Sequence, residues 1–201
     1  MGFKNILFIS REFYPGEAVS EYCKSIAQFL KGKGVKSHLI CFDSYASDEE
    51  LDSLTVHRVP FLLHGDSIFT WGMVMNIELM RRARELIESH NFDLIHINDW
   101  ITIPTGTAIS RFAEIPLVVT FHSIEHERGM GYPHSFVISD LEWDGANDAS
   151  AILVHSKNTN EAIKVFNLPE EKINHTYLEN NWEEKIWDVY KKLGKISINS
   201  R

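Results

Sequence analysis

Short apolar runs alternate along this sequence with longer segments in which apolar residues recur at helical spacing. The apolar runs lie at residues 6–9, 37–42, 55–59, 94–97, 116–121, 151–155 and 173–177. Several of these runs lack polar alternation, which is typical of strands buried on both faces of a sheet. Buried strands that alternate with helices predict βαβ units and a parallel sheet between two layers of helices. We therefore expect an α/β fold, a single three-layer domain with a mostly parallel sheet.

Helical patterns fill most of the segments between these runs. Apolar residues recur at helical spacing over residues 19–30 and 68–89, and shorter helices are expected after Pro104, up to residue 147 and over residues 161–165. The acidic stretch at residues 43–52 shows no apolar pattern, so we expect a solvated loop there.

The charge of the chain excludes several kinds of partner. The 201 residues include 20 Lys and Arg against 28 Asp and Glu, which gives a net charge of −8. A general nucleic-acid binder needs the opposite balance, because neutralised phosphates supply most of its affinity. No basic run is longer than a pair of residues, so we expect neither a nucleic-acid partner nor a membrane surface.

The sequence also predicts a cytoplasmic protein. The apolar run at residues 6–9 is too short for a signal peptide, and the charged Arg11 and Glu12 follow it. Nowhere do 18 apolar residues stand together, as a membrane-spanning helix requires. Cys23 and Cys41 lie inside apolar segments, and we expect both to be buried thiols in a reducing compartment.

Polar residues directly follow several of the expected strands, where open parallel sheets bind ligands. Residues 10–17 (SREFYPGE) lead from the first strand into a helix, whose backbone amides can hold an anion. The segment matches neither GxGxxG nor a P-loop, and a plain strand-to-helix turn is the alternative. Asp99 and Trp100 follow the run at residues 94–97, and such a pair can hydrogen-bond and stack on a sugar. The alternative there is an Asp that caps a helix beside a core Trp.

His122 follows the run at residues 116–121 and is a candidate functional residue. Residues 122–126 (HSIEH) also match H-x-x-E-H, the inverted zinc-protease pattern. That chemistry needs both histidines on one face of a helix and a third ligand elsewhere. Gly129 and Gly131 interrupt a helix here, so we expect no metal and keep zinc hydrolysis only as the weaker alternative.

Four of these segments together resemble the N-terminal, Rossmann-like domain of retaining GT-B glycosyltransferases of the group-1 family, with glycogen and starch synthases as the nearest branch. Residues 12–16 (EFYPG) resemble E-x-x-P-x-x-G-G, residues 96–100 (HINDW) resemble H-x-H-D-W, residues 118–123 (VVTFHS) resemble V-x-T-x-H-[SN], and residues 141–143 (LEW) with 149–156 (ASAILVHS) resemble I-E-x…A-D-x-V-I-x-V-S. The four motifs occur in the family's order, which makes the resemblance specific although each motif alone is weak.

The resemblance implies roles for particular residues. His122 matches the family's active-site histidine, which contacts the transferred sugar, and Asp99 matches an aspartate on the acceptor side. The turn at Pro15 and Gly16 matches the loop over the donor phosphates. Further substrate-binding positions are expected at Asn98, Trp100, Ser123 and Glu125.

Two residues depart from the family pattern. The loop carries Gly16 and Glu17 instead of the family's pair of glycines, so a carboxylate lies where phosphates would approach, at an electrostatic penalty. Asn98 stands where the family's His-Asp-Trp triplet has its histidine.

The end of the sequence resembles another part of the same family. Residues 181–193 (NWEEKIWDVYKKL) are amphipathic and resemble the family's final helix, which crosses back onto the N-terminal domain. We therefore expect an acceptor-side Rossmann-like domain at residues 1–178, a crossover-type packing helix at 179–194 and a tail at 195–201. The family's second, donor-binding domain has no counterpart between these segments, because two such domains need about twice this length.

The expected function follows from the resemblance. It implies transfer of a sugar from a nucleotide-sugar to a glucan or other acceptor, without a metal or another cofactor, by a chain that is incomplete and inactive alone. The alternative is a non-catalytic domain that binds an acceptor or a partner. Such a domain would pair in trans with a separate donor-binding chain or associate with copies of itself.

Overall fold

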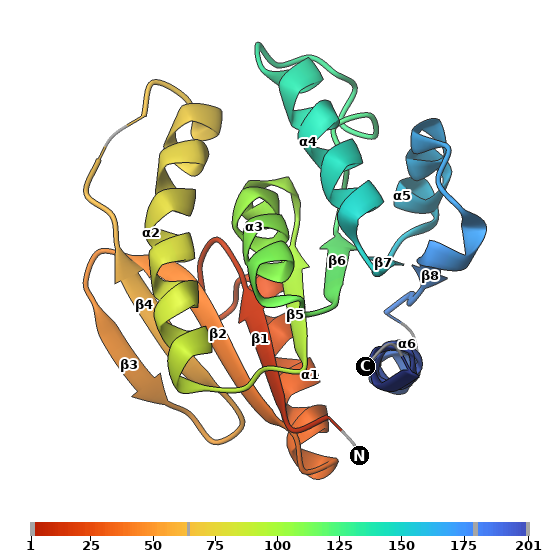
Figure 1. The fold of residues 1–201 in the computed structure, drawn as a ribbon. Coiled ribbons are helices and arrows are strands. Elements are labelled where there is room, and N and C mark those ends of the chain that lie inside the picture. Colours follow the sequence, from red (N-terminus) through yellow and green to blue (C-terminus); the bar gives the residue numbers. More distant parts are fainter. Residues whose placement is uncertain (1–2, 64, 179–180, 200–201) are drawn as a thin grey trace.

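The computed structural model describes residues 3–63, 65–178 and 181–199 of the chain. Their central feature is an eight-stranded sheet with the order β3-β4-β2-β1-β5-β6-β7-β8 (Figure 1). The strands are β1 (Asn5–Ile9), β2 (Lys36–Asp43), β3 (Ser47–Glu50), β4 (Thr55–Pro60), β5 (Leu94–Asn98), β6 (Leu117–Phe121), β7 (Ala151–Val154) and β8 (Ile173–His175). All neighbouring strands are parallel except β3 and β4, which are antiparallel.

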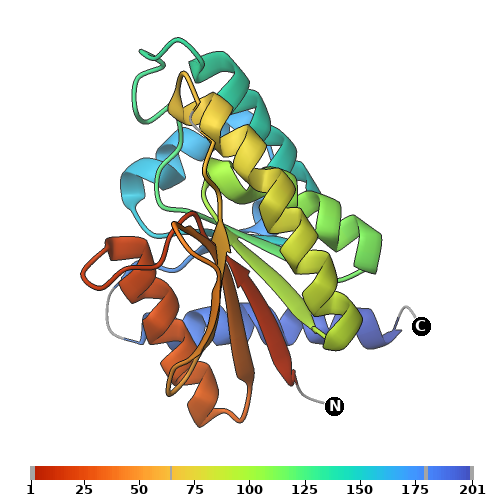
Figure 2. The same ribbon diagram turned by 90° about the vertical axis from the view of Figure 1, so that its left-hand side faces the viewer.

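Helices cover both faces of this sheet, which confirms the predicted three-layer α/β fold. The helices are α1 (Ala18–Gly32), α2 (Ile68–Ser89), α3 (Ile103–Ala113), α4 (Ser135–Asp148), α5 (Lys157–Ala162) and α6 (Trp182–Asn199). Helices α2, α3 and α4 pack on one face, whereas α1 and α6 lie together on the other (Figures 1 and 2).

The strand order creates a switch point beside β1. The chain leaves β1 for β2, continues outward to β4, and returns through α2 to β5 on the opposite side of β1. Loops that follow β1 and β5 therefore diverge and leave a crevice at the carboxyl ends of these strands, where ligands bind in open α/β sheets.

The α2–α3–α4 face of the central strands is apolar. It contains Leu7 and Ile9 of β1 and Ile95 and Ile97 of β5, all without solvent exposure. Gly106 of α3 packs so closely on this layer that an added Cβ would lie 2.5 Å from Cγ2 of Ile97. The close approach of helix and strand therefore depends on glycine at this position.

The α1–α6 face of the same strands carries a buried polar ladder. The Tyr22 hydroxyl of α1 lies 3.1 Å from Oγ1 of Thr120, and that oxygen lies 2.6 Å from Nε2 of His96. Nδ1 of His96 in turn lies 2.5 Å from the hydroxyl of Tyr190 in α6. The ladder thus joins α1, β6, β5 and α6 through side chains that are all buried.

Two predicted boundaries differ from the structure. Residues 47–50 form the edge strand β3 instead of part of a solvated loop, because the backbone pairs with β4 although the side chains are polar. The terminal helix continues past residue 194 to Asn199, so most of the predicted tail is helical. The start of the predicted helical segment, residues 179 and 180, lies outside the described residues.

Cys23 and Cys41 are buried free thiols, as predicted. Within residues 3–63, 65–178 and 181–199, no helix combines the length and apolarity that a membrane crossing needs.

Candidate active site at the strand ends

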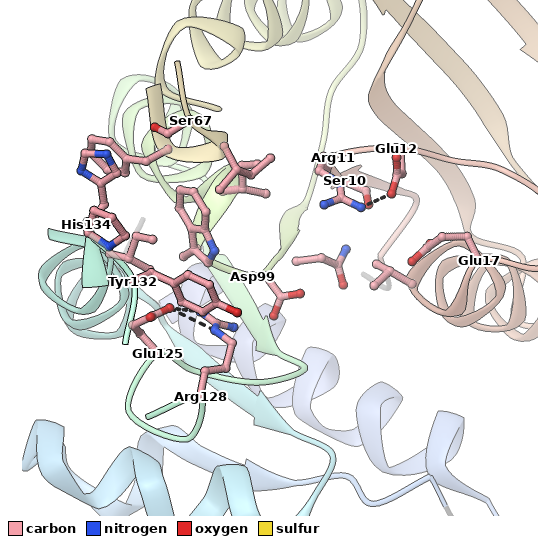
Figure 3. Close-up of a pocket in the computed structure, with 18 of the residues that line it drawn as sticks. Ser10, Arg11, Glu12, Glu17, Ser67, Asp99, Glu125, Arg128, Tyr132 and His134 are labelled. Atoms are coloured by element: carbon pink, nitrogen blue, oxygen red, sulfur yellow. Dashed lines mark hydrogen bonds and ion pairs between the residues drawn. The ribbon is translucent and has the colours of Figure 1, made fainter. Parts of the chain in front are cut away.

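A cavity of about 660 Å³ opens where the loops after β1 and β5 diverge (Figure 3). The segments that line it come from the β1–α1 loop, the end of β5, the start of α2 and the β6–α4 loop. Its lining residues are Ser10, Arg11, Glu12, Glu17, Val19, Asp66, Ser67, Ile68, Phe69, Asn98, Asp99, Trp100, Ile101, Glu125, Arg128, Tyr132, Pro133, His134 and Ile138. The cavity lies at the carboxyl ends of the central strands, where the sequence predicts the candidate site.

Glu17 caps the N-terminus of α1 on one side of this cavity. Its Oε2 accepts hydrogen bonds from the backbone N–H of Ser20 at 2.7 Å and from the Ser20 hydroxyl at 2.8 Å. Partial burial raises the pKa of Glu17, but these hydrogen bonds outweigh it and leave the pKa below its ordinary value. The carboxylate is therefore ionised at neutral pH and occupies an amide that a bound anion would otherwise use.

Asp99 holds the backbone of His122 instead of capping a helix. Its Oδ1 accepts a hydrogen bond of 2.8 Å from the His122 N–H, and its side chain makes no cap bond to the short helix that follows. The alternative of an N-cap aspartate is therefore wrong. Burial raises the pKa of Asp99 to about 6, against opposing hydrogen bonds from the backbone of His122 and Ser123.

His122 is held at its ring as well as at its backbone. Nε2 lies 3.1 Å from Oδ1 of Asn98, and the Tyr22 ring packs edge-on against the imidazole at a centroid distance of 4.9 Å. Burial lowers the pKa of His122 to about 4, so the imidazole is neutral at physiological pH. His122 does not itself line the cavity, but both residues that hold it do.

A buried ionic cluster fixes the loop between β6 and α4. Glu142 accepts two hydrogen bonds from the Glu125 N–H, and Arg128 bridges the carboxylates of Glu125 and Glu142 at 2.9 and 3.1 Å. Ser135 donates a further hydrogen bond to Glu125 at 2.6 Å. Burial raises the pKa of Glu142 to about 7, although Arg128 and the Glu125 N–H act in the other direction. The cluster anchors the loop that places Tyr132 and His134 at the cavity (Figure 3).

Aromatic rings form one wall of the cavity. The Phe69 ring stacks on Trp100 at a centroid distance of 6.2 Å and on His134 at 4.9 Å. Trp100 is largely buried and also lines the cavity, so it serves the core and the site together. Sequence reasoning missed Phe69 and His134, and the one local signal was the Ser67–Thr70 capping box, which marks the start of α2 beside Phe69.

The residues of the H-x-x-E-H pattern do not converge. His122 bonds to Asn98, Glu125 pairs with Arg128 and Ser135, and His126 is exposed. Among the described residues, no three His, Cys, Asp or Glu side chains are grouped as a metal site requires.

Four of the eight predicted site residues line the cavity, namely Asn98, Asp99, Trp100 and Glu125. His122 lies directly behind Asn98 and Asp99. Ser123 faces Arg128, whose Nη1 donates to its hydroxyl at 2.8 Å. Pro15 and Gly16 are exposed in the turn before α1 and do not reach the cavity.

Comparison with known proteins assigns the chain to a glycosyltransferase family. Residues 19–177 match the family described as Glycosyltransferase Family 4. The chain therefore belongs to glycosyltransferase family 4. It is 27% identical over 178 residues to an uncharacterized glycosyltransferase of Methanocaldococcus jannaschii, covering 82% of this chain and 45% of that protein. The chain thus spans about half the length of this relative.

Solved structures of GT-B enzymes share the fold. A fragment of the sucrose-phosphate synthase of Thermosynechococcus elongatus superposes with a TM-score of 0.70 at 15% identity, over 94% of this chain and 99% of the fragment. Anabaena HepE, solved with UDP and glucose, superposes with a TM-score of 0.59 at 20% identity, over 87% of this chain and 44% of HepE. These likenesses establish a Rossmann-like domain of GT-B type.

Proposed function

We propose that this chain forms the acceptor side of a glycosyltransferase site and takes part in transfer of a sugar from a nucleotide-sugar to an acceptor. The observation that carries the proposal is the grouping of Asn98, Asp99 and His122 at the cavity. The side chains of Asn98 and Asp99 line it, and His122 bonds to Asn98 through its ring and to Asp99 through its backbone N–H. Family membership supports the reaction class, and HepE has been solved with UDP and glucose.

The proposed acceptor is an oligosaccharide, with an α-glucan as the first candidate. Stacked rings on one wall and carboxylates on the opposite side match the two faces of a sugar, which has apolar C–H surfaces and hydroxyl edges. The cavity volume lies within the range of small-molecule sites.

Transfer also needs groups that stabilise the leaving diphosphate, and we propose that another domain or chain supplies them. Arg11 and Arg128 line the cavity, but Arg11 pairs with Glu12, and Arg128 pairs with Glu125 and Glu142. Cations that are already paired contribute little to a developing negative charge. The proposed reaction is independent of metals and of other cofactors, and this chain alone is expected to give no turnover.

Sugar binding and transfer test this proposal separately. Malto-oligosaccharide is titrated into the 15N-labelled chain, and transfer is assayed with UDP-, ADP- and GDP-glucose. We expect binding at the cavity, at least about tenfold weaker binding in Asp99→Asn, and no transfer by the chain alone. His126→Ala is the control, because this histidine lies in the β6–α4 loop, which lines the cavity, but is itself exposed and does not line it. Equal binding by Asp99→Asn and the wild type would show that the sugar does not bind in this cavity.

The runner-up function is a non-catalytic domain that docks on a partner chain. Tyr132 and Phe136, near the β6–α4 side of the cavity, are 66% and 76% exposed. Large exposed rings beside a cavity are a feature of interaction surfaces. The mass of the protein in solution, measured with and without a separate donor-binding domain, distinguishes this function from the first.

A further inference from the structure

The hydrogen-bond directions around His122 fix which of its nitrogens carries the proton. Nδ2 of Asn98 faces the carbonyl oxygen of Ile9 at 3.5 Å and the Cys23 sulfur at 3.4 Å. Because a carbonyl oxygen only accepts, the amide nitrogen of Asn98 must point toward Ile9, and Oδ1 must face His122. Nε2 of His122 therefore donates to Asn98 across 3.1 Å.

The other ring nitrogen of His122 is then an acceptor. A neutral imidazole carries one N–H, and burial keeps this imidazole neutral by lowering its pKa to about 4. Nδ1 thus presents a lone pair, and within the described residues no side chain or backbone group hydrogen-bonds to it.

His155 provides an internal contrast in the same cluster. Its ring centroid lies 5.3 Å from that of His122, but its Nδ1 lies 2.8 Å from the carbonyl oxygen of Thr176. That contact requires Nδ1 to be the donor. The two neighbouring histidines are therefore held in opposite tautomers.

A carboxylate on the β1 side of the cavity occupies a group that would otherwise attract an anion. Glu17 accepts from the Ser20 N–H at the start of α1. Glu17 is also close enough to His122 for its negative charge to act on the histidine pKa. An ionised phosphate at this helix end must displace Glu17 and would meet its charge.

We infer that Asp99 and Glu17 form a hydrogen-bond acceptor surface in this cavity, with His122 as a further acceptor directly behind Asp99, and that this surface receives sugar hydroxyl groups and excludes an ionised phosphate. Glu17 is the residue that determines this specificity. Ionised phosphate oxygens cannot donate to such a surface, whereas sugar hydroxyls can. The inference rests on the proposed function, because it names the ligand chemistry of the same site. It also places the diphosphate of a nucleotide-sugar away from the N-terminus of α1.

Two simple probes, titrated separately, test the role of Glu17. Inorganic pyrophosphate and maltose are titrated separately into the 15N-labelled full chain and into Glu17→Gln, and the amide shifts of residues 16–21 are followed. We expect pyrophosphate to bind Glu17→Gln at least about tenfold more tightly than the wild type, a difference that one nearby unit charge can produce. Maltose is expected to bind Glu17→Gln more weakly than the wild type, because a neutral amide oxygen accepts a hydroxyl less strongly than a carboxylate does. The affinities for the two probes should therefore change in opposite directions.

Glu21→Gln is the matched control for charge. It removes one carboxylate from the first turn of the same helix, but Glu21 does not line the cavity. We expect its pyrophosphate affinity to stay within about threefold of the wild type. Equal gains in Glu17→Gln and Glu21→Gln, or tight pyrophosphate binding by the wild type at residues 16–20, would overturn the inference.

The two tautomers are measured first in the wild-type protein and then in one variant of Asn98. Long-range 15N–1H correlation spectra of the wild type at pH 7 are expected to show His122 protonated at Nε2 and His155 at Nδ1. Asn98→Leu removes the acceptor for Nε2 and should shift His122 toward a mixture, while His155 keeps its tautomer. A wild-type His122 that is protonated at Nδ1, or on both nitrogens, contradicts the inference.

These readouts stay separate from those of the proposed function. If the tautomers and the pyrophosphate contrast are as expected but no sugar binds, the exclusion of phosphate by Glu17 stands, whereas the sugar-binding role of the surface and the transferase proposal fail. If sugar binds but pyrophosphate has the same affinity for the wild type and for Glu17→Gln, the transferase proposal stands and the acceptor surface fails.

Discussion

The two faces of the sheet are filled in different ways, although the same four central strands supply both. On the α2–α3–α4 face these strands present only apolar side chains, namely Leu7, Ile9, Ile95, Ile97, Leu117, Val119, Phe121, Ile152 and Val154. On the α1–α6 face, apolar residues at the amino ends give way to His96 and Asn98 on β5, to Thr120 on β6 and to His122 just after β6. One face is packed by shape, and the other is increasingly organised by hydrogen bonds.

This difference shows how the candidate site is supported. His96 and Asn98 lie two residues apart on β5 and so point to the same side of the sheet. Thr120 of β6 bonds to His96 on that side, and His122, which directly follows β6, bonds to Asn98 there. The buried ladder therefore lies directly beneath the candidate site, on the same face of the sheet and closer to the amino ends of the strands. Helix α6 contacts the ladder through Tyr190, which links its packing to the floor of the site.

Removing the centre of the ladder is the most damaging test of this comparison. His96→Ala is expected to lower the free energy of unfolding by about 3–5 kcal/mol, because it empties a fully buried volume, leaves the Tyr190 hydroxyl without a partner and removes one of the two partners of Thr120 Oγ1. Chemical denaturation measures the change. Ile97→Val on the opposite face is the comparison and should lose only about 0.5–1.5 kcal/mol. Similar small losses for both variants would show that the ladder is not a supporting element.

The pH dependence of the unfolding free energy tests the cluster of Glu125, Arg128 and Glu142, which lies on the same side of the sheet as α4. Glu142 has a pKa of about 7 in the folded chain, above its ordinary value of 4.5, chiefly because it is buried. The protonated form is therefore favoured by folding, and this contribution is present below about pH 4.5 and lost as pH rises through about 7. Over that window the unfolding free energy of the wild type should fall by up to about 3 kcal/mol, and that of Glu142→Gln should not show this fall. Denaturation midpoints of both proteins from pH 4 to 8 give the difference, and parallel profiles would contradict it.

The apolar face should be sensitive to added volume. In Gly106→Ala the new Cβ would lie 2.5 Å from Cγ2 of Ile97, so we expect a loss of about 1–3 kcal/mol. Gly32→Ala in α1 meets no atom within 4 Å and should be neutral or slightly stabilising. Thermal unfolding of the two variants separates a packing constraint from a general effect of replacing glycine.

The smallest expected effect comes from one hydroxyl of the ladder. Tyr190→Phe keeps the ring but leaves Nδ1 of His96 unpaired, which should lower the unfolding free energy by about 1–2 kcal/mol. Tyr45→Phe serves as its control, since Tyr45 is 57% exposed. A Tyr190→Phe protein as stable as the control would mean that α6 is held by its apolar residues alone.

Sequence patterns predicted the order of strands and helices wherever burial left an apolar signal. Residues 6–9 and 94–97 were recognisable because both faces of their strands are covered. The edge strand at residues 47–50 left no such signal, since its pairing with β4 is made by the backbone and its side chains are polar.

The site was predictable only in part for a similar reason. Asp99 and His122 follow strands directly, so the sheet topology brings them together and strand-end reasoning could find them. Phe69 and His134 come from the starts of two different helical segments, and their stacking exists only in the tertiary structure. The hydrogen bond from His122 to Asn98 depends on side-chain orientation, which no spacing in a sequence specifies.

The acidic strand β3 has a consequence for the chain in concentrated solution. An edge strand exposes unpaired backbone groups on which a second copy can continue the sheet, and such growth leads to aggregation. The outer strand here carries Asp48, Glu49 and Glu50 in succession, so two copies approaching edge to edge would bring like charges together. The residues that gave no folding signal thus act against the sheet extending from one molecule to the next.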